Sequence, residues 1–104
     1  HAKGAAARLS GQAVPSWPDD EKTFEDLKGR VRKALDYLAT FKPADIDGSE
    51  EKPITLKRNG EDYVLSGQDY LLGRAQQNFW FHVTTAYDIL RMNGVPIGKS
   101  DYTR

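Results

Sequence analysis

The sequence contains no cysteine, which excludes disulfide bonds, thiolate metal ligands and cysteine nucleophiles. It also has no excess of charge, because 15 Lys and Arg residues balance 15 Asp and Glu residues. Nucleic acids and anionic membranes are usually bound through clustered Lys and Arg, so we expect neither as a partner. No apolar run approaches the ~20 residues that span a bilayer, and no stretch has the pattern of a signal peptide. We therefore expect a soluble, cytoplasmic protein.

The length of 104 residues favours one domain, residues 1–104, with a modest core. Hydrophobic residues make up 38% and charged residues 29% of the chain, which is typical of a folded protein rather than a disordered one. The opening HAKGAAARL is an alanine-rich helical pattern with no initiator Met and no capping residue before it. The chain is therefore expected to be a fragment that begins inside a helix.

A loop and a first long helix follow. Residues 10–22 contain Gly11, Pro15 and Pro18 and are typical of a loop. Thr23 and Asp26 then form a capping pair, which predicts a helix from there to about Thr40. Apolar residues recur along it at steps of three and four, on one face: Phe24, Leu27, Val31, Ala34, Leu38 and Phe41.

Residues 53–66 are predicted to form a β-hairpin. Asn59-Gly60 favours a two-residue type I′ turn, because both central positions of that turn need a positive φ. Counting outward pairs Lys57 with Asp62 and places four apolar residues on the opposite face: Ile54, Leu56, Tyr63 and Leu65. An isolated hairpin is marginally stable in water, so this face must pack on another element.

The second long helix is expected from about Gly67 to Asn93, between a Ser66/Asp69 capping box and a stop at Gly94. Its main apolar stripe comprises Leu72, Ala75, Phe79, Ala86 and Leu90, and His82 falls inside this arc. Trp80 and Tyr87 lie on the opposite side. A helix that is apolar on two sides is usually covered on both, which predicts a second layer or a partner subunit.

The segment DYLLGRAQQNFWFHVTTAYDILRMNGVPIGK, with DDEKTFEDLKGRVRKALDYL, GSEEKPITL and HAKGAAARL, resembles an uncharacterised bacterial branch of the DinB/YfiT-like superfamily of metalloenzymes. The resemblance implies an all-α protein with a small β-hairpin, built as an up-down four-helix bundle and often dimeric. It also implies that about sixty residues precede His1. The chain would then supply only the C-terminal part of the bundle, namely two long helices and an N-terminal helical piece.

The resemblance also implies a metal site. Members of the superfamily hold a divalent metal with one histidine on the second helix and an H-x-x-x-H pair on the last. His82 matches the second histidine of that pair, His1 matches the histidine of the second helix, and Asn78 stands where the first histidine of the pair would be. The implied ligands are thus His82, His1 and Asn78, and the implied ion is Zn or Ni. A neutral amide is nevertheless a poorer ligand for such an ion than imidazole.

Several interpretations of these residues stay open. His82 is a structural imidazole hydrogen-bonded to Asn78, Thr85 or a residue of a neighbouring helix, a metal ligand, or a metal-free acid–base group. The protein is a metal-dependent enzyme of the hydrolase or thiol-transferase type, or a metal-free bundle that binds a small ligand or a protein. Asn78 favours the second function, whereas the two histidines in family register favour the first.

Overall fold

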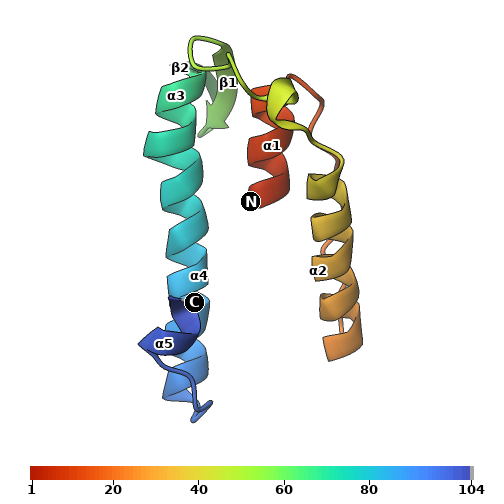
Figure 1. Ribbon diagram of the computed structural model, residues 1–104, viewed down its shortest axis with the longest axis vertical. Helices are drawn as coiled ribbons and strands as arrows, with labels where there is room; N and C mark the ends of the chain where they lie inside the picture. The colour runs from red at the N-terminus through yellow and green to blue at the C-terminus, as the bar shows by residue number, and fades with distance from the viewer. Residues whose placement is uncertain (104) are drawn as a thin grey trace.

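The computed structural model describes residues 1–103 as a mostly helical chain with one antiparallel two-stranded sheet. The two long helical stretches lie on either side of α1, and the hairpin lies at one end of the molecule (Figure 1). In chain order the elements are α1 (Ala2–Ser10), α2 (Phe24–Ala39), the 3-10 turn η1 (Pro43–Asp45), β1 (Pro53–Arg58), β2 (Glu61–Ser66), α3 (Gly67–Asp69), the π-helical segment η2 (Tyr70–Ala75), α4 (Gln76–Met92) and α5 (Lys99–Tyr102).

Helix α2 begins where the sequence predicts. The backbone N–H of Asp26 donates to Thr23 Oγ1 at 3.1 Å, and the backbone N–H of Thr23 donates to Asp26 Oδ2 at 2.9 Å. This reciprocal pair satisfies two backbone donors that the first turn of a helix leaves free. The predicted capping box is therefore confirmed.

The hairpin is also confirmed. Asn59 has a φ of 54° and Gly60 a φ of 88°, as a type I′ turn requires. Strand β1 pairs with β2 in the predicted register, with Ile54 opposite Leu65 and Lys57 opposite Asp62. The ammonium of Lys57 lies 3.6 Å from the Asp62 carboxylate on the outer face, so the inner, apolar face is free to pack on the helices.

Elements α3, η2 and α4 follow one another without a break, which confirms a long helical stretch that starts after Ser66 and stops at Gly94, where φ is 86°. Its π-helical part was not predicted. A π-helix bonds residue i to i+5, so it places an additional residue in the turn and changes which side chains face α1. Tyr70 is only 4% exposed here, whereas Leu72 of the predicted stripe is 49% exposed.

Leu9 of α1, Ile54 of β1 and Tyr70 of η2 form the buried core cluster. Smaller or half-buried apolar side chains surround it: Ala5, Ile46, Leu56, Leu65, Leu71 and Ala75. The start of the long stretch also touches the segment before the hairpin, because a Cβ on Gly67 would lie 1.8 Å from the carbonyl oxygen of Ser49. The core thus joins α1, the hairpin and the long helical stretch.

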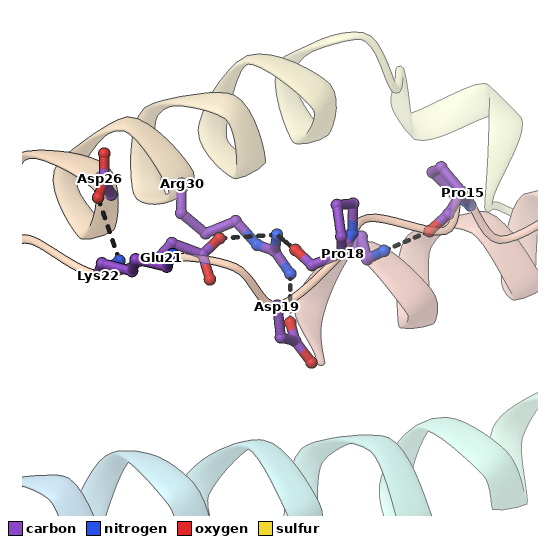
Figure 2. A network of polar contacts seen from close by, with 8 residues as sticks. Pro15, Pro18, Asp19, Glu21, Lys22, Asp26 and Arg30 are labelled. Atoms are coloured by element: carbon purple, nitrogen blue, oxygen red, sulfur yellow. Dashed lines mark hydrogen bonds and ion pairs between the residues drawn. The ribbon is translucent and has the colours of Figure 1, made fainter.

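Arg30 anchors the loop between α1 and α2 (Figure 2). Its guanidinium donates to the Pro18 carbonyl at 2.7 Å and pairs with the carboxylates of Asp19 and Glu21 at 2.8 Å each. The same guanidinium lies 5.3 Å from the ring of Trp17. One side chain of α2 therefore fixes most of the loop that leads back to α1.

The apolar faces that the sequence predicts to be buried are largely open within residues 1–103. Phe24 is 83% exposed, and no residue of α2 is fully buried. Large apolar side chains on both long helices are exposed: Leu27, Val31 and Leu35 on α2, and Phe79, Trp80, Phe81, Ile89, Leu90 and Met92 on α4. On α4, Tyr102 of α5 packs on Trp80 and Tyr87, with ring centroids 6.1 and 5.4 Å apart. Helix α5 thus covers only part of the side of α4 that carries Trp80 and Tyr87.

Across the described residues, no helix combines the length and the hydrophobicity needed to cross a membrane.

Thr23→Ala is expected to lower the free energy of unfolding by about 1 kcal/mol, because it removes the acceptor for the Asp26 backbone N–H. Hydrogen bonds from Thr23 and from the backbone of Lys22 lower the pKa of the Asp26 carboxyl. A lowered carboxyl pKa stabilises the fold above the unfolded value of about 4, and this contribution is lost as the pH falls through the folded value.

The destabilisation by Thr23→Ala should therefore shrink below about pH 4. Urea unfolding at a series of pH values measures it. Ser16→Ala, which removes an exposed hydroxyl from the same loop, is the control and should leave stability unchanged. Equal losses for the two variants would contradict the cap.

We expect the chain to self-associate through the exposed apolar faces, because soluble monomers rarely expose apolar patches larger than a few hundred Å². Light scattering should show more than one chain per particle. Val31→Glu should shift the particles toward monomer. Gly29→Glu adds the same charge to the opposite side of α2, where no atom lies within 4 Å of a new Cβ, and should not change the particle size. A stable wild-type monomer would show the expectation to be wrong.

Candidate functional site

The structure brings together the three residues that the sequence marks as metal ligands. His1 immediately precedes α1, and Asn78 and His82 lie one turn apart on α4. Because the core cluster holds α1 against η2, the first residue of the chain reaches the side of α4. The convergence of His1 with Asn78 and His82 was expected from the resemblance alone.

Asn78 and His82 contact His1 in different ways. Asn78 Nδ2 lies 2.8 Å from His1 Nδ1, within hydrogen-bond distance. The imidazoles of His1 and His82 stack, with centroids 4.3 Å apart and planes 16° from parallel. The ring of Phe81 meets His82 edge-on at 5.4 Å. Asn78, which the resemblance implies as a ligand, is thus a hydrogen-bond partner of His1.

The surroundings of His82 differ from its place in the predicted apolar stripe and from one of the open interpretations. Its side chain is exposed rather than buried in the apolar stripe, because α4 is open to solvent along this face. It also has no hydrogen bond to Asn78 or Thr85 within the described chain, because the amide of Asn78 reaches His1 instead. A buried, hydrogen-bonded His82 is therefore not the arrangement that this fold produces.

The Asn78 amide decides which nitrogen of His1 is available. When Asn78 Nδ2 donates to Nδ1, the proton of the neutral ring is on Nε2 and neither nitrogen has a free lone pair. When the amide is turned over, Oδ1 accepts from Nδ1–H and Nε2 becomes free to bind an ion. Among residues 1–103, no group of three or more His, Cys, Asp or Glu side chains is placed to hold a metal.

Two hollows flank His1, on opposite sides of the contact between α1 and the long helical stretch. The basic cavity, of about 570 Å³, lies toward the hairpin and is lined by His1, Lys3, Gly4, Arg8, Val14, Thr55, Leu56, Lys57, Tyr63, Tyr70, Arg74, Ala75 and Asn78. The apolar groove, of about 430 Å³, is lined by His1, Ala2, Ala5, Ala6, Leu9, Ile46, Leu71, Ala75, Gln76, Phe79 and Trp80. His1 therefore lies between a cationic space and an apolar one.

No sequence pattern indicates the basic cavity. Arg8 and Tyr70, whose polar atoms meet in it, are 62 residues apart. The composition is neutral, and Lys3, Arg8 and Arg74 are not part of a charge run. Only the packing of α1 on η2 gathers these cations on one side of the molecule.

The fold is that of a DinB-like protein. The chain is 38% identical to a crystal structure described as a DinB family member protein from Shewanella denitrificans, with a TM-score of 0.85. The match covers 97% of this chain and 57% of that one, so the chain spans little more than half the length of its structural relative.

The sequence identifies the family within the DinB-like proteins. Residues 1–103 match the model of DUF1993, a domain of unknown function, and the chain belongs to that family. No curated protein matches the chain. The DinB-like resemblance that was drawn from the motifs is thus confirmed at the level of family and fold.

Asn78→Leu is expected to free the His1 ring, because leucine has a similar size and cannot hydrogen-bond. In ¹⁵N NMR spectra the imidazole resonances of His1 should shift, and the free energy of unfolding should change by less than about 1 kcal/mol, as is usual for one exposed hydrogen bond. Gln77→Leu, an exposed neighbour, is the control and should leave the His1 resonances in place. Unchanged His1 resonances in Asn78→Leu would contradict the contact.

Proposed function

We propose that the chain carries a divalent-metal site centred on His1 and His82, and that it acts on a small molecule by chemistry of the hydrolase or thiol-transferase type. The observation that supports this proposal is the approach of the two imidazoles to 4.3 Å from opposite parts of the sequence. The similarity to a protein described as a DinB family member is a second reason to consider a metal site in this chain.

The residues present fit a metal ion in part. Imidazole is a good ligand for Zn and Ni, and the two ring centroids are 4.3 Å apart. Because the rings are stacked and the nitrogen lone pairs lie in the ring planes, the rings would have to turn toward each other to share one ion. Catalytic zinc sites usually have three protein ligands, whereas the third residue here is an amide. In the proposal Asn78 therefore orients His1 through Nδ1, as hydrogen-bond partners of metal-bound histidines commonly do. A bound ion would lower the pKa of a coordinated water or thiol.

A second candidate function is a metal-free module that binds a small ligand. The contact between Asn78 Nδ2 and His1 Nδ1 favours it when the amide donates, because a ring with an engaged Nδ1 and a protonated Nε2 has no lone pair for an ion. The two hollows beside His1 have volumes within the usual range for small-molecule sites.

The proposal includes a homodimer. Helices α2 and α4 both present apolar faces within the described chain, and two copies together would supply four long helices. A four-helix bundle completed in this way would satisfy the architecture that the DinB resemblance implies.

Metal analysis of protein purified without a polyhistidine tag tests the metal proposal. We expect a stoichiometric transition metal, and we expect His82→Ala and His1→Ala each to weaken zinc and nickel affinity at least tenfold in calorimetric titrations. Thr85→Ala, on the same helix, is the control and should bind as the wild type does.

If the protein holds no stoichiometric metal and His82→Ala leaves both affinities unchanged, the metal proposal is wrong and the metal-free function stands. A loss of affinity in His82→Ala but not in His1→Ala would show that the ion is held without α1.

A further inference from the structure

The basic cavity is lined by four cationic side chains, Lys3, Arg8, Lys57 and Arg74, and by no Asp or Glu. Two of these cations already have partners. The ammonium of Lys3 donates to the Pro15 carbonyl and lies 4.3 Å from the Trp17 ring, and Lys57 pairs with Asp62. The cations that remain for a ligand are therefore Arg8 and Arg74.

Arg8 lies flat against its own helix. Its Nη1 donates to the Gly4 carbonyl and to the Tyr70 hydroxyl, at 3.3 Å each. A Cβ on Gly4 would lie 2.8 Å from that nitrogen, so glycine leaves the space that the guanidinium occupies. Within residues 1–103 the Arg8 guanidinium forms no ion pair. Its charge is thus held in place beside the cavity and is not neutralised.

Tyr70 supplies a second, independent observation. The residue is 4% exposed, and its ring lies in the core cluster while its hydroxyl meets Arg8 at the cavity. The hydroxyl oxygen accepts from Arg8, but its own O–H has no acceptor within the described chain. Buried hydroxyl groups normally donate a hydrogen bond, so the Tyr70 O–H is available to an acceptor in the cavity.

Arg74 lies one turn further along the long helical stretch and lines the same cavity. Its side chain is exposed and has no ion pair in the part of the chain that the structure describes. Within residues 1–103, two guanidinium groups without an ion pair thus border a cavity that no Asp or Glu lines. These charges favour a negatively charged occupant.

We propose that the basic cavity binds the oxyanion group of a small molecule, a phosphate or a carboxylate, through Arg8, Arg74 and the Tyr70 hydroxyl. Guanidinium groups bind such oxyanions by short, charge-assisted hydrogen bonds. The volume of about 570 Å³ leaves room for the rest of a small molecule. His1 and Asn78 line the same cavity, so a ligand held in this way presents its remaining atoms to His1. The inference does not depend on a bound metal.

NMR titrations of EDTA-treated protein test the proposal, with inorganic phosphate and citrate as the two oxyanions and trimethyl phosphate as an uncharged probe. We expect saturable shifts at Arg8 and Arg74 with at least one oxyanion and none with trimethyl phosphate. Affinity should fall as salt rises from 50 to 200 mM. Binding of phosphate alone, of citrate alone or of both identifies the group that the cavity accepts.

Arg74→Gln should weaken oxyanion binding about tenfold, since it removes one charge-assisted contact. Tyr70→Phe should weaken it about fivefold and keep the aromatic ring in the core. Gly4→Ala, which moves the Arg8 guanidinium but favours the helix, should also weaken it. Arg91→Gln is the matched control, because Arg91 lies in the last turn of α4 and outside the cavity. Circular dichroism checks that each variant is folded.

The proposal is overturned if neither oxyanion gives saturable binding, if trimethyl phosphate binds equally well, or if Arg91→Gln weakens binding as much as Arg74→Gln. Oxyanion binding that persists in protein with no metal affinity would support the cavity while the metal proposal fails. The two proposals therefore fail independently.

Discussion

The contact on which the rest of the structure depends is the small core of Leu9, Ile54 and Tyr70. Within residues 1–103 this buried cluster joins α1, the hairpin and the long helical stretch. A single buried aliphatic side chain stabilises a fold by roughly 1.5–3 kcal/mol, so a core of this size has little redundancy. The position of His1 depends on it, because this cluster holds α1 against η2.

Tyr70 connects this core to the candidate site. Its ring belongs to the cluster, and its hydroxyl belongs to the basic cavity. The packing that folds the chain therefore also places this hydroxyl at the cavity, where it accepts a hydrogen bond from Arg8 of α1. Tyr70 thus contributes to stability through its ring and to the proposed oxyanion binding through its hydroxyl. Removing the hydroxyl alone separates the two roles.

Local features of the fold could be predicted because they depend on neighbouring residues. Thr23 with Asp26 and Asn59 with Gly60 determine a helix start and a turn through backbone geometry that needs no tertiary contact. The burial of the apolar stripes could not be predicted in this way. Periodicity shows which side chains share a face, but which faces are covered depends on elements distant in sequence, and Leu72 and Phe24 are exposed.

The candidate site also has a part that the sequence could predict and a part that it could not. The meeting of His1 with Asn78 and His82 could be expected from a family register, since the motif residues keep their places in the chain. The basic cavity could not, because Arg8 and Tyr70 are brought together only by tertiary packing. The exposure of His82 could not be predicted either, because the helical pattern places His82 among apolar residues.

The π-helical segment has a geometric consequence for this site. Tyr70, Arg74, Asn78 and His82 follow one another at four-residue intervals. In an α-helix each such interval advances a side chain by about 40° around the axis, so four residues in this series would spiral away from one another. The wider turns of η2 take up part of that rotation in the first interval, which keeps Tyr70, Arg74 and Asn78 directed into a single cavity. The π-helical segment thus reduces the rotation about the helix axis between Tyr70, Arg74 and Asn78. Their polar groups can therefore line one side of the helix, from the core to His1.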